Sequence, residues 1–174
     1  MLTVRQASRD DLARMLVLFA GARARMRRDG NVSQWPEIPG QAAYPQAMLL
    51  EADIAGGFSY VIVDDDQTIR GTFYYREGVD PTYNLIRGAW VNDESYGVIH
   101  RIASDGETTG IVQVATDFAL KMNPNVRVDT HEDNAAMIAA LRKAGYEYCG
   151  IIYIADGSER LAFHLAPTLP KLSF

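Results

Sequence analysis

The sequence predicts an α/β protein in which a single mixed sheet is flanked by helices, all within one domain spanning residues 1–174. Two observations lead to this prediction. Strand-like and helix-like apolar patterns follow one another along the whole chain, without an internal repeat or a low-complexity tract. The length of 174 residues also suits one domain, because a chain of this size can bury a core without metals or disulfides.

The composition excludes some functions and favours others. The formal net charge of −5 argues against a protein that coats nucleic acid, which needs a basic face, and it is compatible with a cationic acceptor such as an amine. The one cysteine cannot form a disulfide within the chain. No apolar stretch approaches the roughly 20 residues of a membrane helix. The first residues alternate like a strand and lack the apolar block of a signal peptide. We therefore expect a cytoplasmic protein.

The chain opens with a predicted strand at 3–7 and a helix behind it. Ser8 and Asp11 have the spacing of a capping box. An apolar face then recurs at helical spacing, formed by Leu12, Met15, Leu16, Phe19 and Ala20. This face stops at Arg23, so the last turns of the helix are expected to be more exposed.

The segment 29–45 is rich in turn-forming residues and predicts a loop. Loops of this length inside a compact domain are often functional. Trp35 and Tyr44 in this loop, together with Trp90 further along, are candidates for lining a substrate pocket. They are equally suited to covering the core.

The same two periodicities place the remaining elements. Helices are predicted at 46–54, from residue 111 onward and at 137–144, the first ending at Gly56-Gly57 and the last at Gly145. Strands are predicted at 58–64, 69–76, 96–103, 126–128, 146–154 and 160–164, with a short strand near 89–91 in the irregular stretch 77–95.

The segment from Ile99 to Val112 carries a chemical signal. A buried strand runs into a loop with Gly106 and Gly110, and a helix begins at once. Unpaired backbone N–H groups at such a helix start can bind a phosphate, and glycine lets the chain approach the ligand closely. A plain helix cap by Thr108 or Thr109 explains the same residues. The glycine-rich fingerprints of Rossmann and P-loop proteins are absent from the sequence.

Two other segments resemble the GNAT acetyltransferase superfamily. Residues 126–134, followed by a helix ending Lys143-Ala144-Gly145-Tyr146, resemble its strand, Asn-initiated helix and Gly-aromatic exit, and residues 149–163 resemble its closing strands. The pair Arg-x-Asp-Thr-His-x-x-Asn and Cys-Gly-Ile-Ile-Tyr is similar to a bacterial group of GNAT proteins of unassigned substrate. With Gln34-Trp35 and Tyr44-Pro45 included, the resemblance covers nearly the whole chain.

The resemblance implies a GNAT fold with splayed central strands and acetyl-CoA as co-substrate. The family's pyrophosphate pattern, Gln/Arg-x-x-Gly-x-Gly/Ala, falls on residues 107–112, where Gly110 matches while Glu107 and Val112 depart from it. The implied cofactor contacts are Ile102, Ala103, Ser104, Thr108, Thr109, Gly110, Ile111, Val112 and Asn134. Asn134 is also of a residue type well suited to capping the helix that follows it.

Direct transfer from a thioester needs a base and a polarised carbonyl. The family polarises the carbonyl with a backbone amide beside a strand bulge, which we expect near residues 102–104. His100 is the best candidate base, because histidine ordinarily titrates near neutrality. The two-residue spacing predicts that His100 and Ile102 share one face of the strand. A partnered core histidine is the alternative, and Glu94 is the second candidate base.

Many GNAT enzymes carry a tyrosine seven residues after the helix-starting asparagine, where it protonates the leaving thiolate. That position is Leu141 here, and Tyr146 and Tyr153 are the replacements to consider. Four possible metal ligands lie close together at Asp129, His131, Glu132 and Asp133, but no further cluster supports them, so a strand end leading into a helix cap is the better interpretation and no metal is expected. Cys149 is expected to be a packing residue.

The sequence therefore predicts an enzyme, an acetyl-CoA-dependent N-acetyltransferase that moves an acetyl group to a primary amine of a small molecule or peptide by direct transfer. No nucleic-acid or membrane partner is expected. The alternative is a catalytically silent GNAT-fold module that binds CoA or another ligand and has a regulatory role. A homodimer through the C-terminal strands or the tail 167–174 is an open alternative to a monomer.

Overall fold

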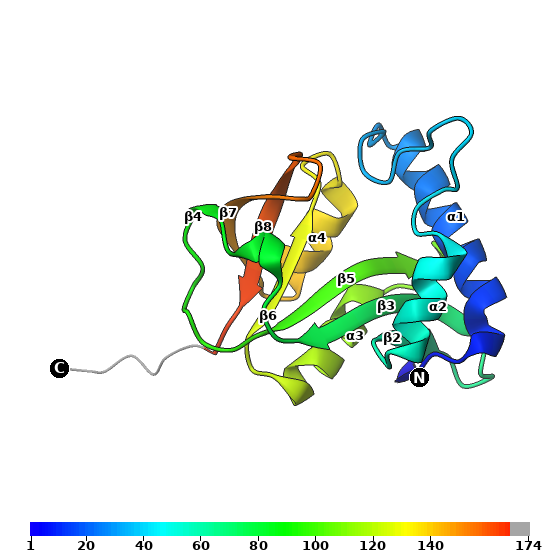
Figure 1. Cartoon of the computed structure of the whole chain (residues 1–174). Coiled ribbons are helices and arrows are strands. Elements are labelled where there is room, and N and C mark those ends of the chain that lie inside the picture. The colour runs from blue at the N-terminus through cyan, green and yellow to red at the C-terminus, as the bar shows by residue number, and fades with distance from the viewer. Residues whose placement is uncertain (168–174) are drawn as a thin grey trace.

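The computed structural model describes residues 1–167 and contains an eight-stranded sheet with strand order β1-β2-β3-β5-β6-β8-β7-β4 (Figure 1). The part of the tail proposed for dimerisation that spans 168–174 lies outside the described residues. The strands are β1 (Thr3–Gln6), β2 (Ser59–Val63), β3 (Ile69–Glu77), β4 (Ile86–Gly88), β5 (Gly97–Ser104), β6 (Val126–Thr130), β7 (Glu147–Tyr153) and β8 (Glu159–Leu165). The helices are α1 (Leu12–Arg28), α2 (Ala47–Ala55), α3 (Ile111–Met122) and α4 (Ala135–Lys143), with short 3-10 turns η1 (Arg9–Asp11) and η2 (Pro81–Tyr83).

The predicted fold class and order of elements are confirmed, and one strand is misplaced. The short strand in the irregular stretch is β4 at 86–88, not 89–91, and it pairs with β7. Gly88 and Gly150 explain the shift, because a Cβ on Gly88 would lie 2.1 Å from the carbonyl oxygen of Cys149. The two backbones approach so closely that glycine, rather than the apolar run around Trp90, determines where the strands pair.

Helices cover both faces of the sheet. On one face α1 and α2 pack over a buried cluster that includes Met15, Phe19 and Leu50. On the other face α3 and α4 pack over a cluster that includes Ala115 and Leu141. The segment 78–96 covers the end of the sheet formed by β7 and β8, around buried Tyr83. None of the helices within residues 1–167 is long and apolar enough to cross a membrane.

The predicted capping box at the start of the first helix is present. The backbone N–H of Ser8 donates to Asp11 Oδ2 at 2.7 Å, and the Arg5 guanidinium donates to both oxygens of the same carboxylate, at 2.8 and 2.9 Å. The bonds from Arg5, assisted by those from Ser8, outweigh the effect of burial and lower the pKa of Asp11 to about 2. Asp11 therefore joins the first strand to the first helix.

β5 and β6 are parallel neighbours that separate after a short paired stretch. Gly97 pairs with Val126 and Val98 with Arg127, and the pairing stops there. Figure 1 shows the two strands running together at their starts and diverging, with α1 and the loop after it on one side of the opening and α4 on the other. The rest of β5 pairs on its other edge with β3, and β6 pairs on its other edge with β8. The two edges that face the opening therefore have free backbone hydrogen-bonding groups.

Candidate active site

A cleft of about 980 Å³ occupies the opening between β5 and β6. It extends past the end of α1, the loop 29–45, the start of α4 and the turn between β7 and β8. The predicted site residues that line it are Trp35, Tyr44, His100, Ile102, Ala103, Ser104, Ile111, Val112 and Asn134. The structure therefore brings most of the predicted residues to one cavity, of a size that suits a drug-sized ligand.

A β-bulge in β5 determines which side chains face this cleft. Tyr74 of β3 lies opposite His100 and Thr72 lies opposite Ala103, so that Arg101 and Ile102 together oppose Phe73. Arg101 has a φ of 50°, in the left-handed region. The bulge begins one residue before the expected stretch 102–104 and overlaps it at Ile102. A bulge adds one residue to a strand and so reverses the alternation of side chains beyond it.

The prediction that His100 and Ile102 share a face is therefore wrong. Ile102 packs with Ile99 against the cluster beneath α3 and α4. His100 contacts Tyr74 and Tyr83 instead, and Arg101 reaches Asp53 of α2 on the opposite face of the sheet. Regular alternation would have placed Ile99 and Arg101 together. The bulge separates them and places His100 and Arg101 side by side.

His100 lies between two carboxylates. Its Nε2 is 2.7 Å from Asp80 Oδ2, in the loop after β3, and its Nδ1 is 3.5 Å from Asp129 Oδ2, on β6. The hydroxyl of buried Tyr83 donates to the same Asp129 oxygen at 2.8 Å. His100 is thus partnered, as the alternative interpretation expects, and it also lines the cleft, as a base must.

The ionisation of these neighbours fixes the proton on the imidazole ring. Burial alone would raise the pKa of Asp80, but hydrogen bonds from His100 and Thr82 outweigh it and lower the pKa to about 2. Burial and the nearby Asp129 raise the pKa of Tyr83 well above its ordinary value, so Tyr83 stays a hydrogen-bond donor. Because ionised Asp80 can only accept, the Nε2 of His100 carries hydrogen. In the neutral ring, Nδ1 is then free to accept a proton.

The loop between β5 and α3 uses some of its amides internally. The N–H groups of Glu107 and Thr108 donate to Asp105 Oδ1 at 3.0 and 2.8 Å, and the N–H of Gly106 donates to Ser104 Oγ. The amide of Thr108, a predicted phosphate contact, is therefore already engaged. Asp105 is ionised, because these bonds and Arg70 lower its pKa against the effect of burial.

The amides that follow have no such partner. Within residues 1–167, the N–H groups of Thr109 to Gln113 donate to no other protein group, and α3 starts at Gly110 without a side-chain cap. Gly110 has a φ of 82° and open space where a Cβ would stand. Neither Thr108 nor Thr109 caps the helix, so the start of α3 keeps the free, positively polarised amides that bind anions.

A cation from α1 lies against this loop. Arg25 donates to the carbonyl oxygen of Ser104 at 2.5 Å and to that of Asp105 at 3.4 Å, and a Cβ on Gly106 would meet its guanidinium. Arg23, two residues earlier, donates to the carbonyl of Tyr44 at 2.9 Å. As expected, the last turns of the first helix are more exposed than the earlier ones, which contain all of its buried residues. Arg23 and Arg25 remain half-buried, because they connect the helix to the loops around the cleft.

Asn134 caps α4 and holds the loop 29–45. Its Oδ1 accepts from the N–H of Met137 at 3.2 Å, and its Nδ2 donates to Gln34 Oε1 at 2.9 Å. Gln34 also receives a bond from buried Asn31. The capping role is observed, and the bond to Gln34 joins the two sides of the cleft mouth. The amide oxygen and nitrogen of Asn134 both have protein partners in this structure.

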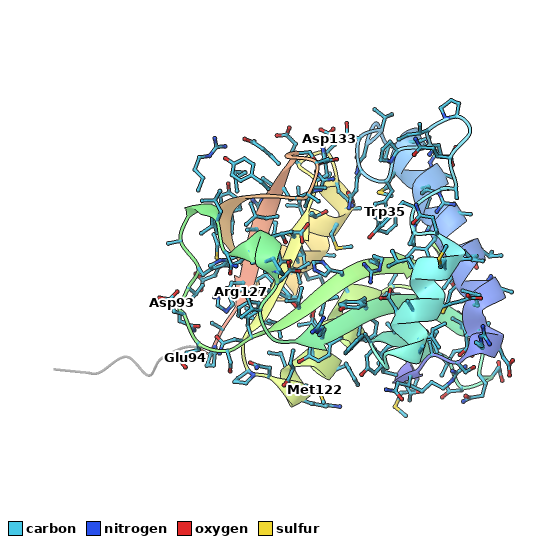
Figure 2. All side chains as sticks on the ribbon, in the orientation of Figure 1. Trp35, Asp93, Glu94, Met122, Arg127 and Asp133 are labelled. Carbon is cyan, nitrogen blue, oxygen red and sulfur yellow. The ribbon has the colours of Figure 1, made fainter. Side chains whose placement is uncertain are left out.

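The structure places Glu94 and Trp90, two further candidates, away from the cleft lining. Glu94 is exposed in the segment 89–96, far from Trp35 and Asp133 at the cleft mouth (Figure 2). Trp90 packs on Tyr83 and donates its indole N–H to the Tyr83 carbonyl. Neither residue therefore lines the cleft, and Trp90 packs on Tyr83, whose hydroxyl binds Asp129.

Neither tyrosine considered as a replacement acid lines the cleft. Leu141 is fully buried in the core under α4, so no acid stands at that position. Tyr146 is buried beneath α3, where its hydroxyl is 3.2 Å from Thr116 Oγ1, and Tyr153 lies outside the cleft lining. Tyr44 does line the cleft, with its hydroxyl 3.3 Å from Arg101 Nη1.

The polar residues at the end of β6 and before α4 have different roles. Asp129 belongs to the His100 cluster, whereas His131 and Asp133 interact with each other at the start of α4. Within residues 1–167, no group of three or more His, Cys, Asp or Glu side chains has the arrangement of a metal site. Burial raises the pKa of the half-buried Cys149 thiol, which suits a packing role.

Sequence reasoning missed two functional candidates, Asp80 and Asp129. Asp80 lies in the irregular stretch before Pro81, 20 residues from His100 in the chain. The only available signal was its position before a proline, which indicates a turn and no chemistry. Asp129 was predicted only as part of a strand end. Its position on β6 also brings it to the edge of the opening, next to His100.

The fold agrees with that of solved acetyltransferases. A GNAT-family acetyltransferase from Streptococcus agalactiae superposes with a TM-score of 0.84 and 29% identity, over 97% of this chain and 96% of that one. One from Bacillus cereus superposes at 0.62 with 16% identity, over 97% and 99%. The ribosomal-protein-S18-alanine N-acetyltransferase of Escherichia coli superposes at 0.53 with 14% identity, over 100% of both chains. The last two similarities show the fold alone.

The splayed strands, the bulge and the cleft define a GNAT-type fold. The 29% identity with the Streptococcus agalactiae protein extends this likeness over nearly the whole sequence, and the chain belongs to the GNAT superfamily. No protein-family model matches the chain, and no curated protein does. The structural matches are acetyltransferases, which supports acyl transfer as the class of reaction.

Proposed function

We propose that this protein is an acetyl-CoA-dependent N-acetyltransferase that transfers an acetyl group directly to a primary amine bound beside His100. One observation carries the proposal. The edges of β5 and β6 separate after Val98 and Arg127, and leave unpaired backbone groups facing one cleft that contains both an anion-binding helix start and a histidine with a carboxylate partner.

The CoA half of the cleft suits the co-substrate's two chemical parts. The pantetheine arm contains two amide groups, which can hydrogen bond to the free edges of β5 and β6 as a strand does. The pyrophosphate suits the free amides of Thr109 to Gln113, with the Arg25 guanidinium adding positive charge next to the loop. Thr108 is left out of this group, because its amide binds Asp105.

His100 supplies the proton acceptor for the transfer. Asp80 holds Nε2–H, so Nδ1 takes a proton from the acceptor ammonium and leaves a neutral amine. The amine nitrogen forms a bond to the thioester carbonyl carbon, the C–S bond breaks and CoA leaves as the thiolate. His100 passes this first proton to solvent or to the thiolate, which frees Nδ1 to take the second proton, lost from the nitrogen as the amide forms. The products are the N-acetylated acceptor and CoA.

Replacement of the family's tyrosine by Leu141 does not prevent this reaction. An alkyl thiol titrates at about 8.5, so a thiolate is a weakly basic leaving group at neutral pH. The missing acid is expected to reduce the rate rather than abolish it. Leu141 favours the second candidate function, a CoA-binding module without catalysis. The hydrogen bond from the Thr108 amide to Asp105 favours it as well.

Two measurements on the intact protein separate these functions. Calorimetric titration with acetyl-CoA is expected to give a dissociation constant below the millimolar range for both. Release of free thiol from acetyl-CoA in the presence of a panel of primary amines is expected for the enzyme alone. Binding without thiol release across the panel favours the module, and absence of binding contradicts both functions.

A further inference from the structure

The half of the cleft on the His100 side carries an excess of negative charge. Its lining includes four carboxylates, from Asp80, Asp129, Asp133 and Asp156. Two arginines also line it. Arg101 is neutralised by Asp53 at 2.6 Å, and Arg160 donates to Ser158 Oγ and the Glu159 carbonyl. With the Asp53 pair counted as neutral, the carboxylates outnumber the remaining cation at this end.

The deepest part of this half suits an ammonium group. His100 Nδ1 and Asp129 Oδ2 are 3.5 Å apart, and neither carries a hydrogen when the imidazole is neutral and the carboxylate ionised. Two facing acceptors are stabilised by a donor that reaches both. A primary ammonium has three N–H groups, so it can donate to Nδ1 and to the carboxylate at the same time. Tyr83 holds the carboxylate in place.

The outer part of this half suits a second cation. Trp35 and Tyr44 line the cleft with ring centroids 6.0 Å apart, and aromatic faces attract cations. Asp133 is 49% exposed at the start of α4, and Asp156 lies in the turn after β7. Figure 2 shows Trp35 and Asp133 facing the same opening from opposite sides. Aromatic and carboxylate groups thus occur together at the cleft mouth.

We propose that the acceptor is an alkyl amine with a second positive charge and no carboxylate, that is, a diamine or polyamine. This inference rests on the proposed function, because it names the acceptor of that reaction. The reacting ammonium binds between His100 and Asp129, and the second cation binds near Asp133, Asp156 and the two aromatic rings. One nitrogen is acetylated while the other keeps its charge.

Three probes of equal chain length test the charge requirement. Cadaverine carries a second ammonium on its fifth carbon, pentylamine carries only hydrogen there, and the fifth carbon of δ-aminovalerate is a carboxylate. Initial rates of thiol release from acetyl-CoA are measured for each at one pH and ionic strength. We expect kcat/KM for cadaverine to exceed that for pentylamine by about tenfold, the effect of one favourable charge contact, and δ-aminovalerate to be the poorest. Equal rates for cadaverine and pentylamine, or a preference for δ-aminovalerate, overturn the inference.

Charge-removing variants locate the second cation site. The double variant Asp133→Asn with Asp156→Asn is expected to bring the ratio of cadaverine to pentylamine kcat/KM close to one. The control is Asp66→Asn, an exposed carboxylate outside the cleft, which keeps the wild-type ratio. An unchanged ratio in the double variant contradicts the proposed placement of the second cation.

Failure of the acceptor class and failure of the enzyme give different results. If acetyl-CoA binds and an amine other than a diamine reacts best, only the acceptor class is wrong. If no probe releases thiol, the enzyme is wrong, and calorimetry with the three amines alone still tests the acceptor site. Tighter binding of cadaverine than of δ-aminovalerate then supports a dication site, and equal or no binding contradicts it.

Discussion

His100 Nε2 lies 2.7 Å from Asp80 Oδ2, and this contact joins the bulged strand β5 to the irregular segment that follows β3. The low pKa of Asp80, about 2, keeps its carboxylate ionised at neutral pH, so the carboxylate fixes both the position and the tautomer of the ring. In the neutral ring, the nitrogen without hydrogen is then Nδ1, which faces Asp129. The first two predictions follow from it.

Replacing the proton acceptor is expected to slow transfer while leaving CoA binding intact. His100→Gln removes the base and keeps a polar side chain, and general-base catalysis typically contributes about 10²–10⁴-fold to the rate. We expect kcat to fall by a factor within this range. The acetyl-CoA dissociation constant is expected to stay within about twofold of the wild-type value. His131→Gln, which changes a histidine outside the cleft lining, is the control. A His100→Gln variant with wild-type kcat contradicts the assignment of the base.

Asp80 is a positioning residue, so its replacement should act on kcat. Asp80→Asn keeps the size of the side chain but lets Nε2 act as an acceptor, which permits the wrong tautomer. We expect kcat to fall by about 10–10³-fold, which is less than the largest losses expected when the base itself is removed. The KM for acetyl-CoA should change little. Partial rescue by Asp80→Glu distinguishes a carboxylate effect from damage to the fold. Equal losses in the two variants contradict it.

Gly110 and Gly157 form a matched pair for testing the anion site. Both have a φ of 82° and open space where a Cβ would stand, so replacement by alanine should cause a similar backbone strain of about 1–2 kcal/mol in each. Gly110 starts α3 beside the free amides, whereas Gly157 is in the turn after β7, and neither glycine itself lines the cleft. We expect Gly110→Ala to weaken acetyl-CoA binding about tenfold by calorimetry, and Gly157→Ala to leave it unchanged. Similar affinities in the two variants count against pyrophosphate binding at α3.

Arg25 and Arg28 allow a comparison of two cations on one helix. Arg25 donates to the carbonyls of Ser104 and Asp105, whereas the side chain of Arg28 is 70% exposed. Arg25→Met keeps the side-chain length and removes the charge. It should weaken acetyl-CoA binding and reduce the salt dependence of that binding, because one charge contact with the pyrophosphate is lost. Arg28→Met is expected to bind as the wild type does, and equal effects would argue against a specific role for Arg25.

Asp11 should make the stability of the fold depend on pH. Its pKa is lowered from 3.8 to about 2 in the folded chain, so its contribution is present above about pH 4 and is lost as the pH falls toward 2. After allowance for the solvent exposure of Arg5, we expect Asp11→Asn to reduce the free energy of unfolding by about 1–2 kcal/mol at pH 7. Urea denaturation from pH 7 to pH 2 should show this difference shrinking. Asp10→Asn, the exposed neighbour, provides the comparison, and a difference independent of pH contradicts the assignment.

The order of the helices and strands was predicted correctly because the patterns that mark them depend on residues close together in the chain. Ser8 and Asp11 determine a helix start within four residues, and Gly145 ends a helix by its own backbone conformation. The turn residues before and after the strands act in the same way. Such features are determined by neighbours in the chain, so sequence periodicity is sufficient to find them.

The site depends on contacts between distant residues, and sequence reasoning recovered it incompletely. His100 was identified, but the bulge at Arg101 and Ile102 arises from pairing with β3 and reversed the expected faces. Asp80 and Asp129 reach His100 from two different segments. The engagement of the Thr108 amide by Asp105 could have been suspected from the Asp-Gly-x-Thr pattern, in which an aspartate typically binds the amides that follow it.

A crystal structure of the protein with acetyl-CoA tests most directly whether the cleft binds this co-substrate. We expect the pantetheine arm between β5 and β6, hydrogen bonded to their free edges, with the pyrophosphate on the amides at the start of α3 and the thioester next to the bulge near His100. Acetyl-CoA bound elsewhere, or β5 and β6 paired along their whole length with the cleft closed, would contradict it.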